Sequence, residues 1–349
     1  MKSSRPNANP GSSERYQWLP AEFNVDEDGG VKIASYINNL HPDEHAELYT
    51  LLASIFEQFV PMFGKVLTDV VHRRPIRFNA TDYHWNDDTE EYELENVPVF
   101  KGVPPPPSIV NLNGRELQVI VKLANIVLTP DDPQYKGGVW HIEGMTNERI
   151  VATGIYYYAS QNITESRLEF RQAVKMPDLE FLNAADEKES MAGTIYNIRR
   201  GTPGNQRLGS ILTKEDRCVV FPNLYQHKVA PFKLTDKNKP GVRKILVFFL
   251  VDPVTPVLST ANVPPQQSTW IKKEIAKREG TRLEELPNEL MQEILKKVDF
   301  GLTLDQAKQY RLELMEERKN YVTRSTKTFE RGLEFEEEED SEDYNLCEH

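Results

Sequence analysis

Residues 150–158 read Ile-Val-Ala-Thr-Gly-Ile-Tyr-Tyr-Tyr, a run of β-branched and aromatic residues that is typical of a strand. Other short runs of this kind lie at 117–128, 167–174, 217–221, 227–232 and 242–251. Gly or Pro turns separate several of these runs. Helical spacing occurs only before and after the block, and this does not favour a parallel sheet, whose strands are joined by crossover helices. The block therefore predicts a β-sandwich or barrel of short strands.

The regions that flank this block have helical patterns. Apolar residues recur at helical spacing between Leu48 and Val60, and again at 286–298 and 304–322, while Thr303 and Gln306 form a capping box. We therefore predict an α+β protein in five parts. These are a disordered N-terminus at 1–14, a helical region at 15–110, a β core at 111–262, a helical region at 263–330 and an acidic disordered tail at 331–349.

Composition and charge limit the classes of partner. The chain has 349 residues and a net charge of -12, so its surface repels phosphate and we do not expect nucleic acid as the main partner. No stretch approaches the roughly 18 apolar residues of a membrane span, so no membrane partner is expected. Two distant cysteines fit a reducing, cytoplasmic location, with the nucleus left open. Cys218 lies in an apolar run and is expected to be buried. The sequence leaves open whether the protein forms a homodimer.

The segment 137–144 reads Gly-Gly-Val-Trp-His-Ile-Glu-Gly and contains a His-x-Glu motif. In an extended strand, alternate residues point to the same face, so His141 and Glu143 can reach one metal ion. A third ligand must come from another strand, and His227, which follows an apolar strand and a Pro-Asn turn, is the candidate. Two histidines and one carboxylate form a facial triad that leaves positions open for substrate and oxygen, as in non-haem Fe(II) oxygenases.

Fe(II) with open positions can bind a 2-oxo acid cosubstrate as well as oxygen. Such a cosubstrate also needs a cation for its distal carboxylate. Arg243 begins the apolar strand at 242–251, and its planar guanidinium can bind a carboxylate through two hydrogen bonds. Neighbouring strand residues point to opposite faces, so Arg243 and Lys244 cannot both point inward, and we select Arg243. Asn125 lies on a strand that leads toward the metal and could contact the cosubstrate; the alternative is a polar core residue with satisfied hydrogen bonds.

The order of His-x-Glu, tyrosine-rich strand, distal His and Arg resembles that of the 2-oxoglutarate oxygenases of the prolyl-hydroxylase type. The resemblance implies a double-stranded β-helix, which is a distorted jelly roll, and the use of Fe(II), 2-oxoglutarate and O₂. It also implies that Tyr157 helps to bind the distal carboxylate. Two features depart from the pattern: Glu143 stands where most relatives have Asp, and the spacing from His227 to Arg243 is longer, with 234–240 as an added hairpin loop.

Three shorter runs carry a closer resemblance. Residues 140–145 (Trp-His-Ile-Glu-Gly-Met), 163–167 and 246–253 resemble an uncharacterised, mainly fungal family of domain-of-unknown-function proteins. That resemblance covers most of the chain, from about residue 16 to residue 322, and implies the same fold without naming a substrate.

These observations predict a jelly-roll core with N-terminal and C-terminal helices packed around it. The expected function is an Fe(II)- and 2-oxoglutarate-dependent dioxygenase that hydroxylates a small-molecule, peptide or protein substrate. Two alternatives stay open, namely a non-catalytic jelly-roll binding module and a metal-dependent jelly-roll enzyme that does not use 2-oxoglutarate. His41 and His45 also have the spacing of a helical metal pair, but a surface pair near a helix start is the preferred interpretation.

Overall fold

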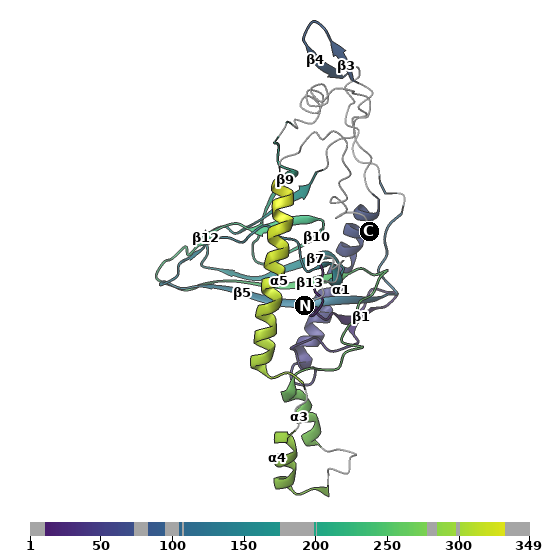
Figure 1. Cartoon of the computed structure of the whole chain (residues 1–349), viewed down its shortest axis with the longest axis vertical. Coiled ribbons are helices and arrows are strands. Elements are labelled where there is room, and N and C mark those ends of the chain that lie inside the picture. The colour runs from purple at the N-terminus through teal and green to yellow at the C-terminus, as the bar shows by residue number, and fades with distance from the viewer. Residues whose placement is uncertain are drawn as a thin grey trace, which may run out of the picture.

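The computed structural model describes residues 11–72, 83–94, 105–106, 108–174, 199, 201–277, 285–297 and 301–331. These residues form antiparallel sheets with helices beside them, so the predicted α+β class is confirmed (Figure 1). The predicted tail lies outside the described residues except for Arg331, and so do residues 1–10 of the predicted disordered N-terminus.

A six-stranded antiparallel sheet, the large sheet, forms the centre of the molecule. Its strand order is β10-β7-β13-β5-β1-β2. The strands are β1 (Ala21–Val25), β2 (Val31–Ile33), β5 (Glu116–Leu128), β7 (Ile150–Gln161), β10 (Arg217–Pro222) and β13 (Gly241–Val251). The three longest strands, β5, β7 and β13, lie side by side and coincide with the apolar runs that the sequence marks as strands.

A smaller sheet faces one side of the large sheet. Its order is β11-β8-β9, and a separate pair, β12-β6, lies in another two-stranded sheet. The strands are β6 (Gln134–Tyr135), β8 (Arg167–Ala173), β9 (Asn205–Leu212), β11 (Tyr225–Val229) and β12 (Phe232–Lys233). Tyr157 and Phe249 of the large sheet pack in one buried cluster with Leu168 of the small sheet. We call the side of the large sheet that carries Tyr157, Val247 and Phe249 its inner face.

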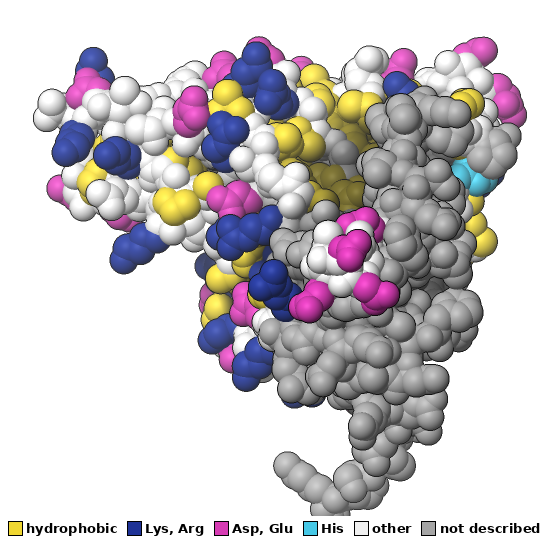
Figure 2. Space-filling model, turned by 90° about the horizontal axis from the view of Figure 1, so that it is seen from above, with side chains coloured by type: hydrophobic (Ala, Val, Ile, Leu, Met, Phe, Trp, Pro, Cys, Tyr) yellow, Lys and Arg dark blue, Asp and Glu magenta, His cyan; other side chains and the backbone are white. Residues whose placement is uncertain are grey.

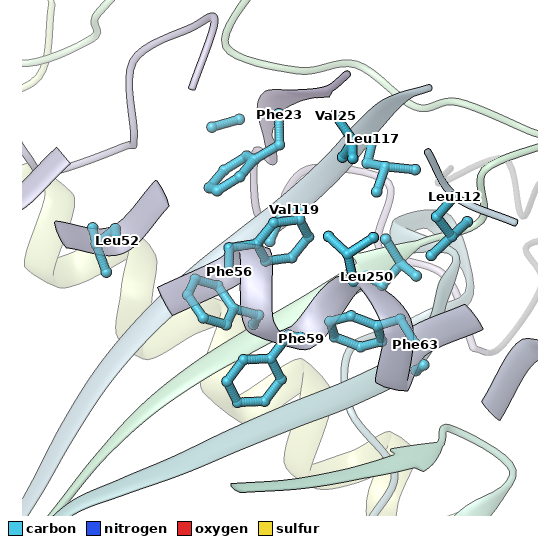
Figure 3. Close-up of a cluster of buried hydrophobic side chains, with 14 of the residues drawn as sticks. Phe23, Val25, Leu52, Phe56, Phe59, Phe63, Leu112, Leu117, Val119 and Leu250 are labelled. Carbon is cyan, nitrogen blue, oxygen red and sulfur yellow. The ribbon is translucent and has the colours of Figure 1, made fainter. Parts of the chain in front are cut away.

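Helix α1 (Ala46–Val71) covers the opposite, outer face of the large sheet. Figure 3 shows the rings of Phe56, Phe59 and Phe63 on the helix among strand residues such as Leu250, and all three rings are fully buried. By length and composition alone α1 could cross a membrane. Its packing on the sheet accounts for this composition, because a helix that buries one face against a core needs the same apolar residues.

The close approach of α1 depends on a glycine in β7. A Cβ at Gly154 would lie 2.6 Å from Cδ1 of Phe59 and 2.9 Å from Cζ of Phe63. We expect Gly154→Ala to destabilise the protein by about 1–3 kcal/mol, because the added methyl forces these rings to move. Urea unfolding measures this. In a Phe59→Ala background the same substitution should cost much less, and an equal cost in both backgrounds would contradict the packing explanation.

The C-terminal helices lie at one end and along one side of the molecule (Figure 1). They are α3 (Ser268–Lys277), α4 (Asn288–Lys297) and α5 (Leu304–Glu330). The predicted capping box is confirmed, because the Thr303 hydroxyl accepts from the Gln306 amide at 3.2 Å and the Gln306 side chain accepts from the Thr303 amide at 2.9 Å. Leu314 and Tyr321 of α5 pack against Met145 in a small buried cluster.

The structure differs from the sequence prediction in several places. The region expected to be helical also contains β1 and β2, which extend the large sheet, and a hairpin of β3 (Tyr83–Asn86) and β4 (Glu91–Leu94). Strands this short show too few alternations to be recognised. Residues 11–14 are also held in place, since the Gly11 carbonyl accepts from the Thr146 amide at 2.9 Å.

Two further differences concern an edge strand and the surface. Cys218 is exposed rather than buried, because it lies on β10 at the edge of the large sheet. Strand β9 was not expected, because much of its sequence is polar. On the face shown in Figure 2, Lys and Arg side chains are interspersed with Asp and Glu, and apolar side chains line a recess.

Candidate metal centre

The structure brings the three predicted ligands together. Oε1 of Glu143 lies 3.3 Å from Nε2 of His227 and 3.7 Å from Nε2 of His141. One ligand atom from each residue lies within 4.8 Å of the other two. The backbone explains this convergence, because the His141 and His227 amides each donate to the other residue's carbonyl, at 3.1 and 2.9 Å. This antiparallel bridge sets the two imidazoles side by side, with ring centroids 4.4 Å apart.

Neighbouring groups fix the orientation of the ligands. Asn223 accepts from the Glu143 amide and donates to the Glu143 carbonyl, both at 2.9 Å, and it also donates to the Ile150 carbonyl. Its side chain therefore joins the Glu143 segment to the start of β7. Nδ1 of His141 lies 2.7 Å from the Val139 carbonyl; if it donates there, Nε2 is left as the ligand atom. The sequence shows Asn223 only as a turn residue, so its role was missed.

The charges of the three groups suit a divalent cation. Burial acts to raise the pKa of Glu143, but the two imidazoles outweigh it and hold that pKa well below its usual range. Burial lowers the pKa of His227. Burial also acts to lower the pKa of His141, but the contact with Glu143 reverses the shift and raises it. One carboxylate and two imidazole nitrogens on one side of a space are the donor set of a facial triad, so these residues fit Fe(II).

A buried cation and a phenol lie on the inner face. The Arg243 guanidinium carbon is 4.9 Å from the Tyr157 ring centroid, and the two residues are 3% and 0% exposed. Among the described residues, no carboxylate lies within 4.0 Å of Arg243, and neither its Nε nor the Tyr157 hydroxyl has a hydrogen-bond partner. Buried polar groups are normally satisfied, so this pair can receive the carboxylate of a ligand.

The ionisation of this pair supports a role as donors. Burial raises the pKa of Tyr157 to about 12, although the charge of Arg243 acts in the opposite direction, so the phenol keeps its proton at neutral pH. Burial lowers the pKa of Arg243, and Tyr157 and Tyr135 oppose that shift. Tyr135 of β6 is thus a further neighbour of Arg243, and nothing in the sequence pattern around it marked it.

Asn125 does not join these residues. It lies opposite Lys244 in the pairing of β5 with β13, and directly opposite residues share a face of the sheet. That face is the outer one, because Arg243 next to Lys244 points inward. Asn125 is exposed and its Oδ1 accepts from the Tyr158 hydroxyl at 3.2 Å. The structure therefore separates Asn125 from Arg243 and Tyr157 by the thickness of the sheet.

A second group of candidate ligands consists of His41, Asp43 and Glu274. Asp43 and Glu274 are exposed and both contact Lys277, at 3.7 and 2.6 Å. His41 packs its ring on Trp270 at 4.7 Å, and His45 is not a member of the group. Ion pairs with a lysine account for this arrangement. The predicted surface pair is correct for His45, which is exposed, and wrong for His41, which is buried against Trp270.

The sequence matches the model of one protein family. The family model described as "Protein of unknown function (DUF4246)" matches residues 3–274. The chain belongs to the DUF4246 family. The match includes every residue of the candidate centre and ends within α3, so α4 and α5 of this DUF4246 protein lie outside it. None of the curated proteins matches the sequence.

Several solved structures are similar to this DUF4246 chain at a distance. One is the Fe(II)/(alpha)ketoglutarate-dependent dioxygenase TqaL, with 12% identity, 71% of this chain and 74% of that chain covered, and a TM-score of 0.33. A second is hydroquinone 1,2-dioxygenase PnpCD, with 14% identity, 44% of this chain and 67% of that chain covered, and a TM-score of 0.18. A third is PirA, with 10% identity, 37% of this chain and 92% of that chain covered, and a TM-score of 0.16. These TM-scores are too low for the likenesses to carry an argument.

Proposed function

We propose that this protein is an Fe(II)- and 2-oxoglutarate-dependent dioxygenase that hydroxylates a small-molecule or peptide substrate. One observation carries the proposal. The ligand triad, through His227, and the Arg243–Tyr157 pair both contact the same buried cluster between the two sheets. The His227 ring contacts Phe221 at 4.8 Å, and Phe221 belongs to the same buried cluster as Tyr157. A metal chelate and a carboxylate anchor can therefore serve one ligand.

We also propose that β5 to β13 form a jelly roll. The order of the strands supports this. Strands β5, β7, β10 and β13 belong to the large sheet, whereas β6, β8, β9, β11 and β12 belong to the smaller ones, so the chain crosses repeatedly from one side to the other. Such crossing is typical of double-sheet jelly rolls. The bridge between His141 and His227 adds the ligand segment beside β11.

The residues of the chain have distinct tasks in this mechanism. With Fe(II) bound, O₂ would oxidise 2-oxoglutarate to succinate and CO₂ and convert a substrate C–H bond to C–OH, one oxygen atom entering each product. His141, Glu143 and His227 would hold the ion, and the Glu143 carboxylate would neutralise part of its charge. Arg243 and Tyr157 would donate hydrogen bonds to the distal carboxylate of 2-oxoglutarate and so orient its 2-oxo acid group.

Binding of 2-oxoglutarate tests the role of Arg243. With Mn(II) as an ion that does not react with O₂, we expect the wild-type protein to bind 2-oxoglutarate in calorimetry, and Arg243→Ala to weaken that binding about 10- to 100-fold, because a charge-assisted pair is lost. Mn(II) affinity should not change. Lys244→Ala, which alters the neighbouring residue on the outer face, is the control and should leave both affinities intact. Equal 2-oxoglutarate binding by Arg243→Ala would favour a metal enzyme that does not use this cosubstrate.

Turnover tests the dioxygenase proposal as a whole. In air, with Fe(II), 2-oxoglutarate and ascorbate, the wild-type protein should release succinate slowly even without its substrate. Ascorbate then supplies the two electrons that the substrate would have given. Release of succinate that depends on both Fe(II) and His227 is the expected result. A protein that binds Fe(II) and 2-oxoglutarate but never forms succinate would favour the non-catalytic binding module.

A further inference from the structure

Helix α5 presents one stripe of side chains to the segment that carries two of the candidate ligands. The members of this stripe recur every three or four residues, so they share one face of the helix, and they are Leu314, Arg318, Tyr321 and Ser325. Tyr321 packs with Met145, and Ile142 packs against the same cluster. Ile142 stands between His141 and Glu143 in the chain. The helix therefore contacts the ligand segment at the residue between two ligands.

The C-terminal part of α5 is hydrogen-bonded to the residue that precedes each histidine ligand. These preceding residues are Trp140 and Gln226. The Thr326 hydroxyl donates to the Trp140 carbonyl at 3.3 Å, and the Ser325 hydroxyl accepts from the side-chain amide of Gln226 at 3.4 Å. Two adjacent residues of one helix thus contact both halves of the backbone bridge that brings the imidazoles together.

The link through Gln226 is buried and has a partner at each end. Gln226 is 0% exposed, and its side-chain oxygen accepts from Nε of Arg171 on β8 at 2.8 Å. Arg171 is also buried, and it donates to Glu330 near the end of α5 at 3.3 Å. The small sheet therefore holds one end of the Gln226 amide and α5 holds the other. An amide that is buried and bonded in this way has one orientation, which fixes β11 relative to α5.

These contacts lie behind the ligands, on the side away from the buried cluster between the sheets. The His227 ring contacts Phe221 of that cluster, and neighbouring strand residues point to opposite faces, so Gln226 points away from it. Arg171 is directly opposite Gln226 in the pairing of β8 with β11, and its guanidinium carbon is 4.7 Å from the ring centroid of Trp140. Substitutions on α5 therefore alter the support of the ligands without removing a ligand.

We infer that Ser325 and Thr326 of α5 are positioning residues for the metal centre, and that they hold the His141 and His227 imidazoles at the separation that an ion requires. This inference rests on the metal site of the proposed function. The bridge between the two ligand segments has one hydrogen bond in each direction, so its geometry depends on the groups that flank it. Groups that orient metal ligands from behind contribute about 10- to 100-fold to metal affinity.

Calorimetry with Mn(II) and the full chain tests this role. The double variant Ser325→Ala with Thr326→Val removes both hydroxyls, and we expect it to bind Mn(II) about ten-fold more weakly than the wild-type protein. Thr323→Val is the matched control, because the exposed Thr323 hydroxyl donates to the Lys319 carbonyl of its own helix at 2.8 Å. This control and Thr326→Ser, which keeps its hydroxyl, should both bind Mn(II) as the wild-type protein does.

Hydrogen exchange tests the bridge in the absence of metal. The His141 and His227 amides are bonded across the bridge at 3.1 and 2.9 Å, so they should be protected in the wild-type protein. The double variant should exchange both amides about ten-fold faster, while the amides at the centre of β13 keep their rates. The single variants Ser325→Ala and Thr326→Val should each give a smaller increase, and they serve as the test if the double variant does not fold.

Three results would overturn the inference. The first is an unchanged Mn(II) affinity in the double variant, even if the protein became less stable, because the two hydroxyls would then only attach the helix. The second is an equal loss of affinity in Thr323→Val. The third is unchanged exchange of the His141 and His227 amides. If the wild-type protein bound no Mn(II), the proposed function would fail, and the exchange rates would still decide whether α5 holds the bridge.

Discussion

The Glu143→Ala protein is expected to lose tight binding of Fe(II) while it keeps its fold. Glu143 is the only anion of the three candidate ligands, and its carboxylate lies between the two imidazoles. Without it, the doubly charged ion keeps only two neutral donors. Altering groups behind the ligands costs about 10- to 100-fold in metal affinity, so the loss of a ligand should exceed 100-fold. Anaerobic calorimetry with Fe(II) measures this, and circular dichroism checks the fold.

A surface carboxylate between β7 and β8 provides the control. Glu165 is exposed and pairs with Arg167 at 3.3 Å, so Glu165→Ala removes the same negative charge without touching the centre. Its Fe(II) affinity should equal that of the wild-type protein. If Glu143→Ala also bound Fe(II) normally, the ion would have to bind elsewhere, and the group at His41, Asp43 and Glu274 would be the next candidate.

The Glu148→Ala protein should be strongly destabilised. Glu148 is 1% exposed and accepts from Arg318 of α5 at 2.5 and 2.7 Å, from the Trp18 amide at 2.6 Å and from the Met145 amide at 2.9 Å. Its removal leaves the Arg318 guanidinium, which lies 3.4 Å over the Trp18 ring, without its carboxylate. Breaking a buried pair from one side costs about 3–5 kcal/mol, and urea unfolding should show a loss of this size.

Two variants separate this effect from loss of charge in general. Glu316→Ala on the exposed side of α5 breaks an ion pair with Lys319 and should cost less than about 1 kcal/mol. The double variant Glu148→Ala with Arg318→Met should be more stable than Glu148→Ala alone, because no unpaired charge stays buried. Equal stability of the Glu148→Ala and Glu316→Ala proteins would contradict the role of the pair as the anchor of α5.

Local rules predict which residues are candidate ligands, but they do not predict that these residues come together in space. Alternation along an extended strand is enough to place His141 and Glu143 on one side. The identification of His227 as their partner depended on the order of motifs, and the structure supplies the physical reason, a backbone bridge between the two segments. In the same way, alternation separates Arg243 from Lys244. It could not say which face was inner, and the burial of Arg243 beside Tyr157 now indicates the direction.

Contacts between distant segments were beyond prediction. Asn125 could be assigned to a strand, but its face depended on its register with Lys244. The contact of α5 with Glu148 joins residues that no local pattern relates. The longer spacing before Arg243 is absorbed in the segment 234–240, where the Asn162 side chain donates to the carbonyls of Asp236, Lys239 and Pro240. Such side-chain bonds leave no periodic trace in a sequence.

The most direct measurement is the visible absorption of the protein mixed anaerobically with Fe(II) and 2-oxoglutarate. Chelation of Fe(II) by a 2-oxo acid produces a charge-transfer band that neither component gives alone. We predict this band for the wild-type protein and its loss in the His227→Ala variant. A wild-type protein that binds both components without developing the band would contradict the claim that the ion at His141, Glu143 and His227 holds the cosubstrate.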